Sequence, residues 1–484
     1  MAEPTQKFVE DLTDLSDDFS RWYIEVVQKA QLADYAPVRG CIVFRPYGYA
    51  LWENMQRLLD ARIKDTGHEN AYFPLLIPES FLAQEAEHVE GFAPQVAWVT
   101  QGGDDVLEER LAIRPTSEAI IGKMYAKWID SWRDLPVLIN QWANVMRWEK
   151  VTRPFLRTVE FLWQEGHTAH RTAEEAQQET LKMLEVYRAF AEEDLAIPVH
   201  KGAKTASEKF PGADMTYSIE ALMRDGKALQ AGTSHNLGQH FAKVFDITFQ
   251  DQDGERRHVH QTSWGASTRL IGAIIMSHGD DQGLRLPPRV APVQAVIVPI
   301  YKKDEEKAEV LAFAERVRSG VAAAGVRVRL DARDNYTPGW KYNEWEMKGV
   351  PVRIEIGPRD VAKDSVVFVR RDTREKAFVP AAEIATRLVA LLEDVQTALF
   401  QRAFDFRAEN TRVADDLATM AKILEEKRGF VSAHWCGDAE CEAAIKAETS
   451  ATIRNLPFDV PEEPGRCVRC GKPSPRRVLF AKSY

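Results

Sequence analysis

The sequence predicts a protein of three domains that each combine helices and strands. Its 484 residues exceed what a single hydrophobic core usually organises. A proline-rich stretch at 285–292, Arg-Leu-Pro-Pro-Arg-Val-Ala-Pro, interrupts regular structure, and four of the five cysteines lie near the C-terminus. We therefore expect an α+β domain with an antiparallel sheet flanked by helices over residues 1–287, an α/β domain over 288–395, and a small zinc-binding α/β domain over 396–484.

The composition excludes several classes of protein. Hydrophobic residues make up 45% and charged residues 28% of the chain, which argues against general disorder. No apolar run approaches the roughly 20 residues that a membrane-spanning helix needs. Residues 1–18 lack the basic and then apolar pattern of a secretory signal, so we expect a cytoplasmic protein. The net charge of −10 argues against general nonspecific binding of nucleic acid, although it permits a local basic groove.

In the first domain, two strand-like runs flank a turn and predict an antiparallel hairpin. Residues 137–149 form the first run, in which Arg147 and Glu149 share a face. Residues 156–167 form the second run. One face of this second run carries Arg157, Val159, Phe161, Trp163, Glu165 and His167. Considered alone, the pattern allows a solvated sheet face with cross-strand ion pairs, and it also allows a binding site.

Two other segments of this domain carry local signals. Thr172-x-x-Glu175 is typical of a capping box that begins a helix. Residues 263–272, Ser-Trp-Gly-Ala-Ser-Thr-Arg-Leu-Ile-Gly, place small side chains and Arg269 before an apolar helix, which would let a phosphate approach the start of that helix. The segment lacks the Gly-x4-Gly-Lys-Ser/Thr pattern and is therefore not a P-loop.

The segment after the proline-rich stretch predicts alternating strands and helices. Strands are expected at 293–300, 326–330 and 350–356. Asp304 is expected to cap a first helix. A second helix should lie between Thr337-Pro338 and Gly349, because proline is favoured in the first turn and glycine just past the end. From about residue 383 a helix leads into the C-terminal tail.

The cysteines of the tail form two close pairs, Cys436-x4-Cys441 and Cys467-x2-Cys470. Four thiolates can hold one tetrahedral Zn²⁺, and such a closed shell predicts a structural rather than a catalytic ion. Incidental free thiols are the alternative, and His434 is an alternative ligand. Cys41 lies far from these residues and is expected to be an ordinary core residue.

Together these segments resemble the class II aminoacyl-tRNA synthetases. Arg147-Trp148-Glu149 resembles their second signature motif. Gly265-x-Ser267-x-Arg269 resembles the third, with fewer glycines than its usual form. A helix at 51–64 followed by a strand at 71–78 resembles the first motif, which forms a dimer interface in that class.

Three longer segments are similar to those of prolyl-tRNA synthetases. They are Arg-Pro-Thr-Ser-Glu at 114–118, Phe-Leu-Trp-Gln-Glu-Gly-His-Thr-Ala-His at 161–170, and Gln-Ala-Gly-Thr-Ser-His at 230–235. The resemblance covers essentially the full chain, in the archaeal and eukaryotic-like form that ends in a zinc-bearing domain. It implies a homodimeric proline–tRNA ligase that makes prolyl-adenylate from L-proline and ATP and then charges tRNA(Pro), releasing AMP and diphosphate.

The resemblance also implies roles for individual residues. The catalytic residues would be Arg147, which would hold the α-phosphate and the substrate carboxylate, and Arg269, which would hold the γ-phosphate. The ATP site would be completed by Glu149, Arg157, Thr158, Gln230 and Thr233, and Mg²⁺ should accompany ATP. The proline pocket would consist of Thr116, Glu118, Arg147, Trp163, Glu165, His167, His235 and Ser267.

Beyond the catalytic domain, Glu346 and Arg353 are the residues expected to read the guanines of proline anticodons. A nearby basic set is expected either to hold phosphates or to be a solvated surface; its members are Arg370, Arg371, Arg374 and Lys376. The segment between His170 and Ser263 is too short for the large editing insertion of bacterial-type prolyl enzymes, so activation of alanine is expected.

Two other functions are alternatives to a prolyl-tRNA synthetase. One is a synthetase for another small amino acid, with threonine and cysteine as the nearest candidates, but the segments at 114–118 and 163–167 fit these poorly. The other is a noncatalytic synthetase-like binding protein. The intact set of Arg147, Glu149 and Arg269 argues against it, because a site without catalysis has no physical need for them.

Overall fold

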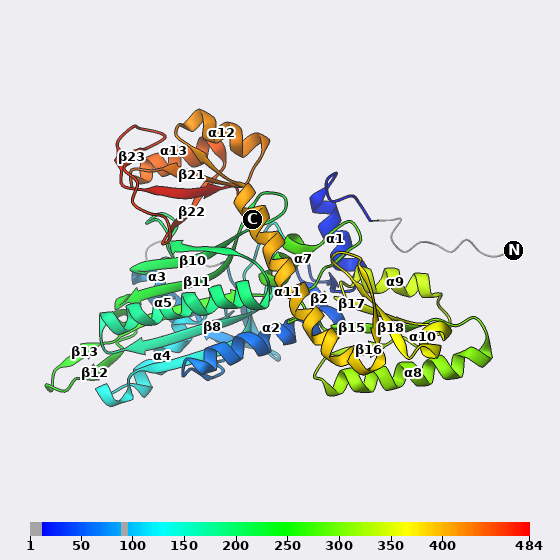
Figure 1. Ribbon diagram of the computed structural model, residues 1–484. Coiled ribbons are helices and arrows are strands. Elements are labelled where there is room, and N and C mark those ends of the chain that lie inside the picture. The colour runs from blue at the N-terminus through cyan, green and yellow to red at the C-terminus, as the bar shows by residue number, and fades with distance from the viewer. Residues whose placement is uncertain (1–11, 89–94) are drawn as a thin grey trace.

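A large sheet forms the centre of the protein in the computed structural model, which describes residues 12–88 and 95–484 (Figure 1). Its 11 strands have the order β20-β21-β25-β22-β9-β10-β11-β14-β8-β7-β3. The strands from the first domain are β3 (Glu69–Asn70), β7 (Val137–Met146), β8 (Glu160–His170), β9 (Val199–Ala203), β10 (Met215–Leu222), β11 (Ala228–Gly238) and β14 (His260–Ser267). These strands pair antiparallel, except β3, which runs parallel to β7.

Helix α5 (Ala173–Ala189) lies across one face of this sheet, along β11 and β14. The predicted capping box is confirmed, because the side chains of Thr172 and Glu175 each accept a hydrogen bond from the other residue's backbone N–H. The apolar helix predicted after Arg269 is also confirmed. The remaining helical elements of the first domain are α1 (Phe19–Lys29), α2 (Pro46–Asp65), α3 (Glu79–His88), α4 (Glu118–Trp128), η1 (Trp132–Asp134), η2 (Phe190–Asp194), α6 (His240–Val244) and α7 (Arg269–His278).

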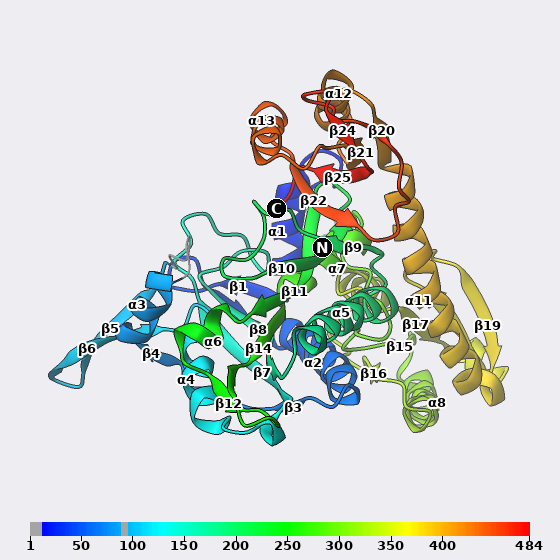
Figure 2. The same ribbon diagram turned by 90° about the vertical axis from the view of Figure 1, so that its left-hand side faces the viewer.

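A hairpin arm projects from this domain beside α3 (Figure 2). It is a three-stranded sheet of β4 (Leu76–Pro78), β6 (Asp105–Ile113) and β5 (Ala97–Gly102). The strand predicted at 71–78 is therefore present only in its last three residues. The backbone N–H of Ala71 donates to the backbone oxygen of Asn140 in β7 at 2.8 Å, and that of Phe73 donates to the side chain of Gln141, also in β7, at 2.6 Å. Residues 71–75 therefore lie against β7 without forming a regular strand ladder. Two further small sheets pair β1 (Ala33–Tyr35) with β2 (Ile42–Phe44) and β12 (Thr248–Gln250) with β13 (Arg256–His258).

The second domain is a five-stranded sheet with the order β16-β15-β17-β18-β19. Its strands are β15 (Ala295–Pro299), β16 (Val328–Leu330), β17 (Val352–Ile356), β18 (Ser365–Arg370) and β19 (Lys376–Pro380), and the first three are parallel. Helices α8 (Asp304–Ala323), α9 (Pro338–Met347) and α10 (Pro358–Ala362) connect them. Thr337 caps α9 as predicted, with its side chain accepting from Trp340 N. The prediction for Asp304 is wrong, because Asp304 is the first residue of α8 and Lys303 occupies the cap position.

A long helix, α11 (Ile384–Glu409), follows the short η3 (Ala381–Glu383) and leads to the C-terminal domain. That domain contains β20 (Thr411–Ala414), α12 (Leu417–Glu426), β21 (Phe430–His434), α13 (Ala439–Thr449), β22 (Thr452–Pro457), β23 (Gly465–Arg466), β24 (Pro473–Ser474) and β25 (Arg477–Ala481). Strand β22 pairs with β9, so the sheet of the C-terminal domain continues the central sheet (Figure 2). No helix in the described part of the chain has the length and apolar character that crossing a bilayer requires.

Candidate active site

A cavity of about 370 Å³ opens on the face of the central sheet opposite α5. The strand register explains which side chains line it. His167 on β8 pairs with Ser263 on β14, and Ser263 pairs with His235 on β11. In the same way, Glu165 is joined through Gly265 to Thr233. Because directly paired residues point to the same face of a sheet, three strands present their polar side chains together.

The cavity brings together most of the residues predicted for the site. Those that line it are Thr116, Glu118, Arg147, Trp163, Glu165, His167, Gln230, Thr233, His235, Ser267 and Arg269. Three predicted residues, Glu149, Arg157 and Thr158, do not line it. Glu149 and Arg157 face one another with 3.8 Å between Oε2 and Nη1, and the buried Thr158 hydroxyl donates to the backbone oxygen of Glu160 at 2.6 Å.

The turn between the two strands is longer than the sequence suggests. β7 ends at Met146 and β8 begins at Glu160, so neither Arg147 nor Arg157 lies within a strand as predicted. The backbone between them is irregular, and Phe155 has a positive φ of 60°. Phe161, Trp163, Glu165 and His167 nevertheless line the cavity, which confirms the predicted shared face for these four residues.

Glu165 is held rigidly beneath the cavity. Its Oε1 accepts hydrogen bonds from Ser117 Oγ at 2.5 Å and from Gln141 Nε2 at 2.8 Å, and its Oε2 lies 3.2 Å from His167 Nε2. Burial alone would disfavour the charged His167, but the hydrogen bond to Glu165 and the charges of Glu118 and Glu165 outweigh it and raise the pKa of His167. The Glu165 carboxylate therefore favours the protonated form of the His167 imidazole.

A second carboxylate, Glu118, stands at the start of α4 and is buried. The hydroxyl of Thr116 donates to it. On the far side of the pocket, burial and the positive charge of His167 lower the pKa of His235 to about 3, so this imidazole is neutral. The site thus places a buried carboxylate and a neutral imidazole beside the Glu165–His167 pair.

Arg147 brings positive charge against these groups. Its Nε donates to the backbone oxygen of Pro115 at 3.0 Å, and its guanidinium lies 5.4 Å and 5.6 Å from the ring centres of Phe161 and Trp163. Burial lowers the pKa of Arg147, although Glu118 and Glu165 oppose this effect. A guanidinium and carboxylates in one enclosed cavity suit a ligand that carries both signs of charge.

Arg269 begins α7 at the other part of the cavity. Its Nε donates to the backbone oxygen of Leu156 at 3.2 Å. Burial, and then the positive charges of Arg157 and Arg147, lower the pKa of Arg269 to about 10. Three guanidinium groups that repel one another in this way favour an anion with several charges, such as a polyphosphate.

Residues that the sequence did not single out close the site. The segment at 204–211 supplies Lys204, Phe210 and Pro211 to the cavity lining. The ring of Phe210 lies 4.7 Å from that of His235. This segment has no periodic pattern and no motif, so its role could not be predicted. Gln141, which positions Glu165, was also not predicted. The only signal in the sequence was its location on the polar face of a predicted strand.

In the second domain, Glu346 and Arg353 lie together. Glu346 Oε1 is 2.6 Å from Arg353 Nη1, and the Arg353 guanidinium lies 4.0 Å from the ring centre of Tyr342. Of the nearby basic set, Arg371 is buried, with Nη2 2.6 Å from Asp280 of the first domain, and Arg370 is paired with Asp372. These two arginines therefore hold the protein's own carboxylates.

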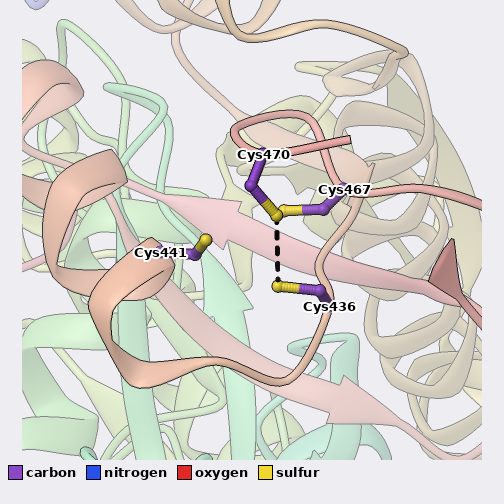
Figure 3. A group of neighbouring side chains, drawn as sticks. All are labelled: Cys436, Cys441, Cys467 and Cys470. Atoms are coloured by element: carbon purple, nitrogen blue, oxygen red, sulfur yellow. Dashed lines mark hydrogen bonds between the residues drawn. The ribbon is translucent and has the colours of Figure 1, made fainter. Parts of the chain in front are cut away.

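The four cysteines of the tail converge (Figure 3). Their sulfur atoms lie within 4.8 Å of one another, and Sγ of Cys470 is 3.6 Å from Sγ of Cys436. A tetrahedral ion with Zn–S bonds of about 2.3 Å requires sulfur separations of about 3.8 Å, so the thiols fit zinc. His434 is not part of this group, and its Nδ1 lies 3.2 Å from the hydroxyl of Ser474. Cys41 is buried, as predicted.

Comparison with known proteins gives a consistent result along the chain. Three family models match it: the tRNA synthetase class II core domain (G, H, P, S and T) at residues 98–278, the anticodon binding domain at 294–391, and the prolyl-tRNA synthetase C-terminal domain at 417–484.

Relatives match over almost their whole length. A proline–tRNA ligase of Natranaerobius thermophilus is 60% identical, with 100% of both chains covered. One from Rubrobacter xylanophilus is 60% identical over 98% of this chain and 99% of its own. A crystal structure of prolyl-tRNA synthetase from Cryptosporidium parvum, complexed with halofuginone and AMPPNP, has a TM-score of 0.94 and 45% identity, and covers 98% of this chain and 99% of its own.

Proposed function

The chain belongs to the prolyl-tRNA synthetase family, and from this premise we propose which of its residues hold each substrate. The reaction is that of the family: proline is activated with ATP and ligated to tRNA. The single observation that carries the residue assignment is the cavity in which Arg147 lies between buried carboxylates and a second arginine, Arg269.

The first half of the cavity holds L-proline. The protonated secondary amine is recognised by Thr116 and Glu118, which offer a hydroxyl oxygen and a carboxylate. The substrate carboxylate lies against Arg147. Trp163 provides a flat apolar surface for the ring of proline. The other residues of the pocket are Glu165, His167, His235 and Ser267. Support for this assignment comes from the burial of Glu118 and Glu165 and from the fixed geometry of Glu165.

The second half holds ATP. Arg147 binds the α-phosphate, which the carboxylate of proline attacks, and Arg269 binds the γ-phosphate of the diphosphate that leaves. Such a transfer depends on positioning and charge stabilisation, which two bidentate guanidinium groups supply. Gln230 and Thr233 line this half, and three residues beside it complete the set: Glu149, Arg157 and Thr158. Mg²⁺ accompanies ATP and neutralises its phosphates.

We assign residues 1–287 to the catalytic domain, 288–395 to the anticodon-binding domain and 396–484 to the zinc-bearing domain. Glu346 and Arg353 are proposed to recognise the guanines of the proline anticodon, because a carboxylate and a guanidinium can pair with the edges of unstacked bases. The complete enzyme is proposed to be a cytoplasmic homodimer. Apolar side chains exposed within the segment that resembles the first motif support this, among them Tyr72 and Leu76, at 69% and 37% exposure.

Zinc is proposed to bind to Cys436, Cys441, Cys467 and Cys470 and to stabilise the C-terminal domain. Elemental analysis of the purified protein should find one zinc per chain, and replacement of Cys470 by serine should lower that content. Loss of the ion should unfold the tail before the catalytic domain. A zinc content near zero, together with disulfides detected by mass spectrometry, would contradict the assignment.

Amino-acid-dependent exchange of diphosphate into ATP tests the substrate assignment. All twenty amino acids are compared at equal concentration, without tRNA. Proline should give the largest kcat/KM, and threonine and cysteine should give little exchange. A larger signal with threonine or cysteine would assign the pocket to another small amino acid, and no exchange with any amino acid would favour a noncatalytic binding protein.

A further inference from the structure

The C-terminal domain contributes one side chain, Arg454, to a buried ion cluster of the catalytic domain. Glu220 on β10 is completely buried, and its Oε2 accepts hydrogen bonds from Arg454 Nη2 at 2.9 Å and Nε at 3.1 Å. Its Oε1 accepts from Lys204 Nζ at 2.8 Å. Lys204 Nζ also donates to the backbone oxygen of Arg454, at 2.7 Å. The three residues therefore form one closed unit across two domains.

This cluster adjoins the half of the cavity that we assign to ATP. Glu220 is the cross-strand partner of Gln230 on β11, and Lys204 itself lines the cavity. Burial and the charges of Arg157 and Arg147 have the largest effects on the pKa of Arg269. Glu220 and Arg454 are near enough to have smaller effects: Glu220 raises this pKa and Arg454 lowers it. A change in the cluster would consequently alter the positions and the electrostatics of the residues that line the nucleotide site.

The surrounding structure fixes Arg454 in place. Pro457 and Leu456 of β22 pair with Gly202 and Ala203 of β9, immediately before Lys204. The segment at 204–211, which closes the cavity, begins there. A second residue of the C-terminal domain, Glu442 on α13, accepts a hydrogen bond from the Thr205 hydroxyl at 2.8 Å. The start of this segment is therefore anchored to the C-terminal domain by both a strand and side chains.

The guanidinium of Arg454 compensates for the buried negative charge of Glu220. A buried carboxylate is tolerated only while cations and hydrogen bonds compensate for its lost hydration. Without the guanidinium, Glu220 would retain only Lys204 and the hydroxyl of Ser218, which donates to Oε1 at 2.9 Å. Oε2 would then lose both of its donors. We expect Glu220 to turn toward Lys204, and Lys204 to shift at the edge of the cavity.

We propose that Arg454 is a positioning residue for ATP, which acts through Glu220 and Lys204 to fix the strand edge and the closing segment of the nucleotide site. The zinc-bearing domain is thereby a structural part of the ATP site. The proposal rests on the assignment above of Gln230 and Arg269 to ATP, and it predicts an effect on ATP that proline binding does not share.

The test compares Arg454→Met, Arg454→Lys and a matched control, Lys482→Met, in diphosphate exchange with the full-length protein. Lys482 belongs to the same domain, and its ammonium forms a surface pair with Glu425 at 3.1 Å. Arg454→Met should raise the KM for ATP about tenfold, the size expected for lost hydrogen bonds to a charged group, and change the KM for proline less than about twofold. Arg454→Lys should recover part of the loss, and Lys482→Met should match the wild type.

Wild-type KM for ATP in folded Arg454→Met would overturn the proposal, as would equal increases in the KM values for ATP and proline. If Arg454→Met does not fold, Arg454→Lys decides: a raised KM for ATP supports the proposal, and wild-type constants overturn it. Gln230→Ala is measured in parallel. If that variant leaves the KM for ATP unchanged, the assignment of the ATP half is at fault, whatever Arg454 does.

Discussion

One cavity holds two side chains of opposite charge, Arg147 and Glu118. Arg147 and Glu118 are both enclosed, and each lowers the electrostatic cost of burying the other. A zwitterionic amino acid can replace water in such a cavity, because its amine faces the carboxylate and its carboxylate faces the guanidinium. The geometry of the guanidinium then matters as much as its charge.

Arg147→Lys tests this geometry. A lysine keeps the positive charge, but its ammonium cannot present a planar fork to a phosphate and a carboxylate at once. We expect proline-dependent diphosphate exchange to fall at least about tenfold, or roughly 1.4 kcal/mol of transition-state stabilisation, while circular dichroism shows a folded protein. Exchange near the wild-type rate would remove Arg147 from the site.

The pair of Glu165 and His167 predicts a dependence of stability on pH. The pKa of His167 is raised in the folded protein, so the pair stabilises the fold below the ordinary histidine value of 6.5, and this contribution is lost as the pH rises through the folded value. In Glu165→Gln the burial effect dominates and the contribution disappears. The difference in unfolding free energy between wild type and Glu165→Gln should therefore be largest near pH 6 and shrink at higher pH.

Urea unfolding at several pH values between about 5.5 and 9 measures this difference. The window stays above the range in which Glu165 itself titrates, because hydrogen bonds from its partners lower its pKa despite burial. Glu185→Gln serves as a control, since Glu185 is half-exposed and pairs with Arg188 and Lys201. A difference that is constant with pH would show that His167 does not change its charge through Glu165.

Sequence patterns correctly predicted the features that local periodicity determines. The period of two identified the shared face of Phe161, Trp163, Glu165 and His167, and the capping box of α5 was correct. The strand predicted at 71–78 was mostly wrong, because after one backbone bond from Ala71 to Asn140 the chain is bound by the side chain of Gln141, a residue distant in sequence. No local pattern could have revealed that bond.

Glu346 and Arg353 of the anticodon-binding domain should affect tRNA charging but not amino-acid activation. Glu346→Ala and Arg353→Ala should each lower kcat/KM for charging of tRNA(Pro) by more than about tenfold, through lost hydrogen bonds to base edges. Exchange without tRNA should hardly change, because both residues lie outside the catalytic domain. Arg318→Ala is the control, since Arg318 pairs with Glu315 on the exposed surface of α8. A parallel fall in both assays would mean that the domains are coupled, for example through Arg371 and Asp280.

One sheet of 11 strands runs through two of the three domains. The sequence indicated separate units, and it could not reveal that β22 continues the sheet at β9, because that pairing joins residues far apart in the chain. The same nonlocal pairing brings Arg454 to Glu220. Patterns along the chain therefore predicted the composition of the site better than the connections between its supporting domains.

The structure of the segment between the second and third motifs bears on how well the enzyme rejects alanine. All residues from 171 to 262 are described, and they form α5, η2, β9, β10, β11, α6, β12, β13 and part of β14, with their connecting loops. Within this stretch no additional domain is inserted. A pocket that fits proline cannot exclude the smaller alanine by steric clash, so discrimination depends on lost apolar contact, worth about 1–3 kcal/mol or roughly 10–200-fold.

We therefore expect measurable activation of alanine and accumulation of alanyl-tRNA when the pure enzyme receives tRNA(Pro), ATP and alanine. The decisive measurement adds preformed alanyl-tRNA(Pro) to the enzyme and follows deacylation against buffer alone. Decay at the buffer rate would mean that clearance requires a separate protein, as the continuous core between motifs leads us to expect. Hydrolysis that rises with enzyme concentration would instead reveal a hydrolytic site in this chain. The same assay with Arg147→Lys would then show whether hydrolysis takes place in the cavity that activates proline or elsewhere.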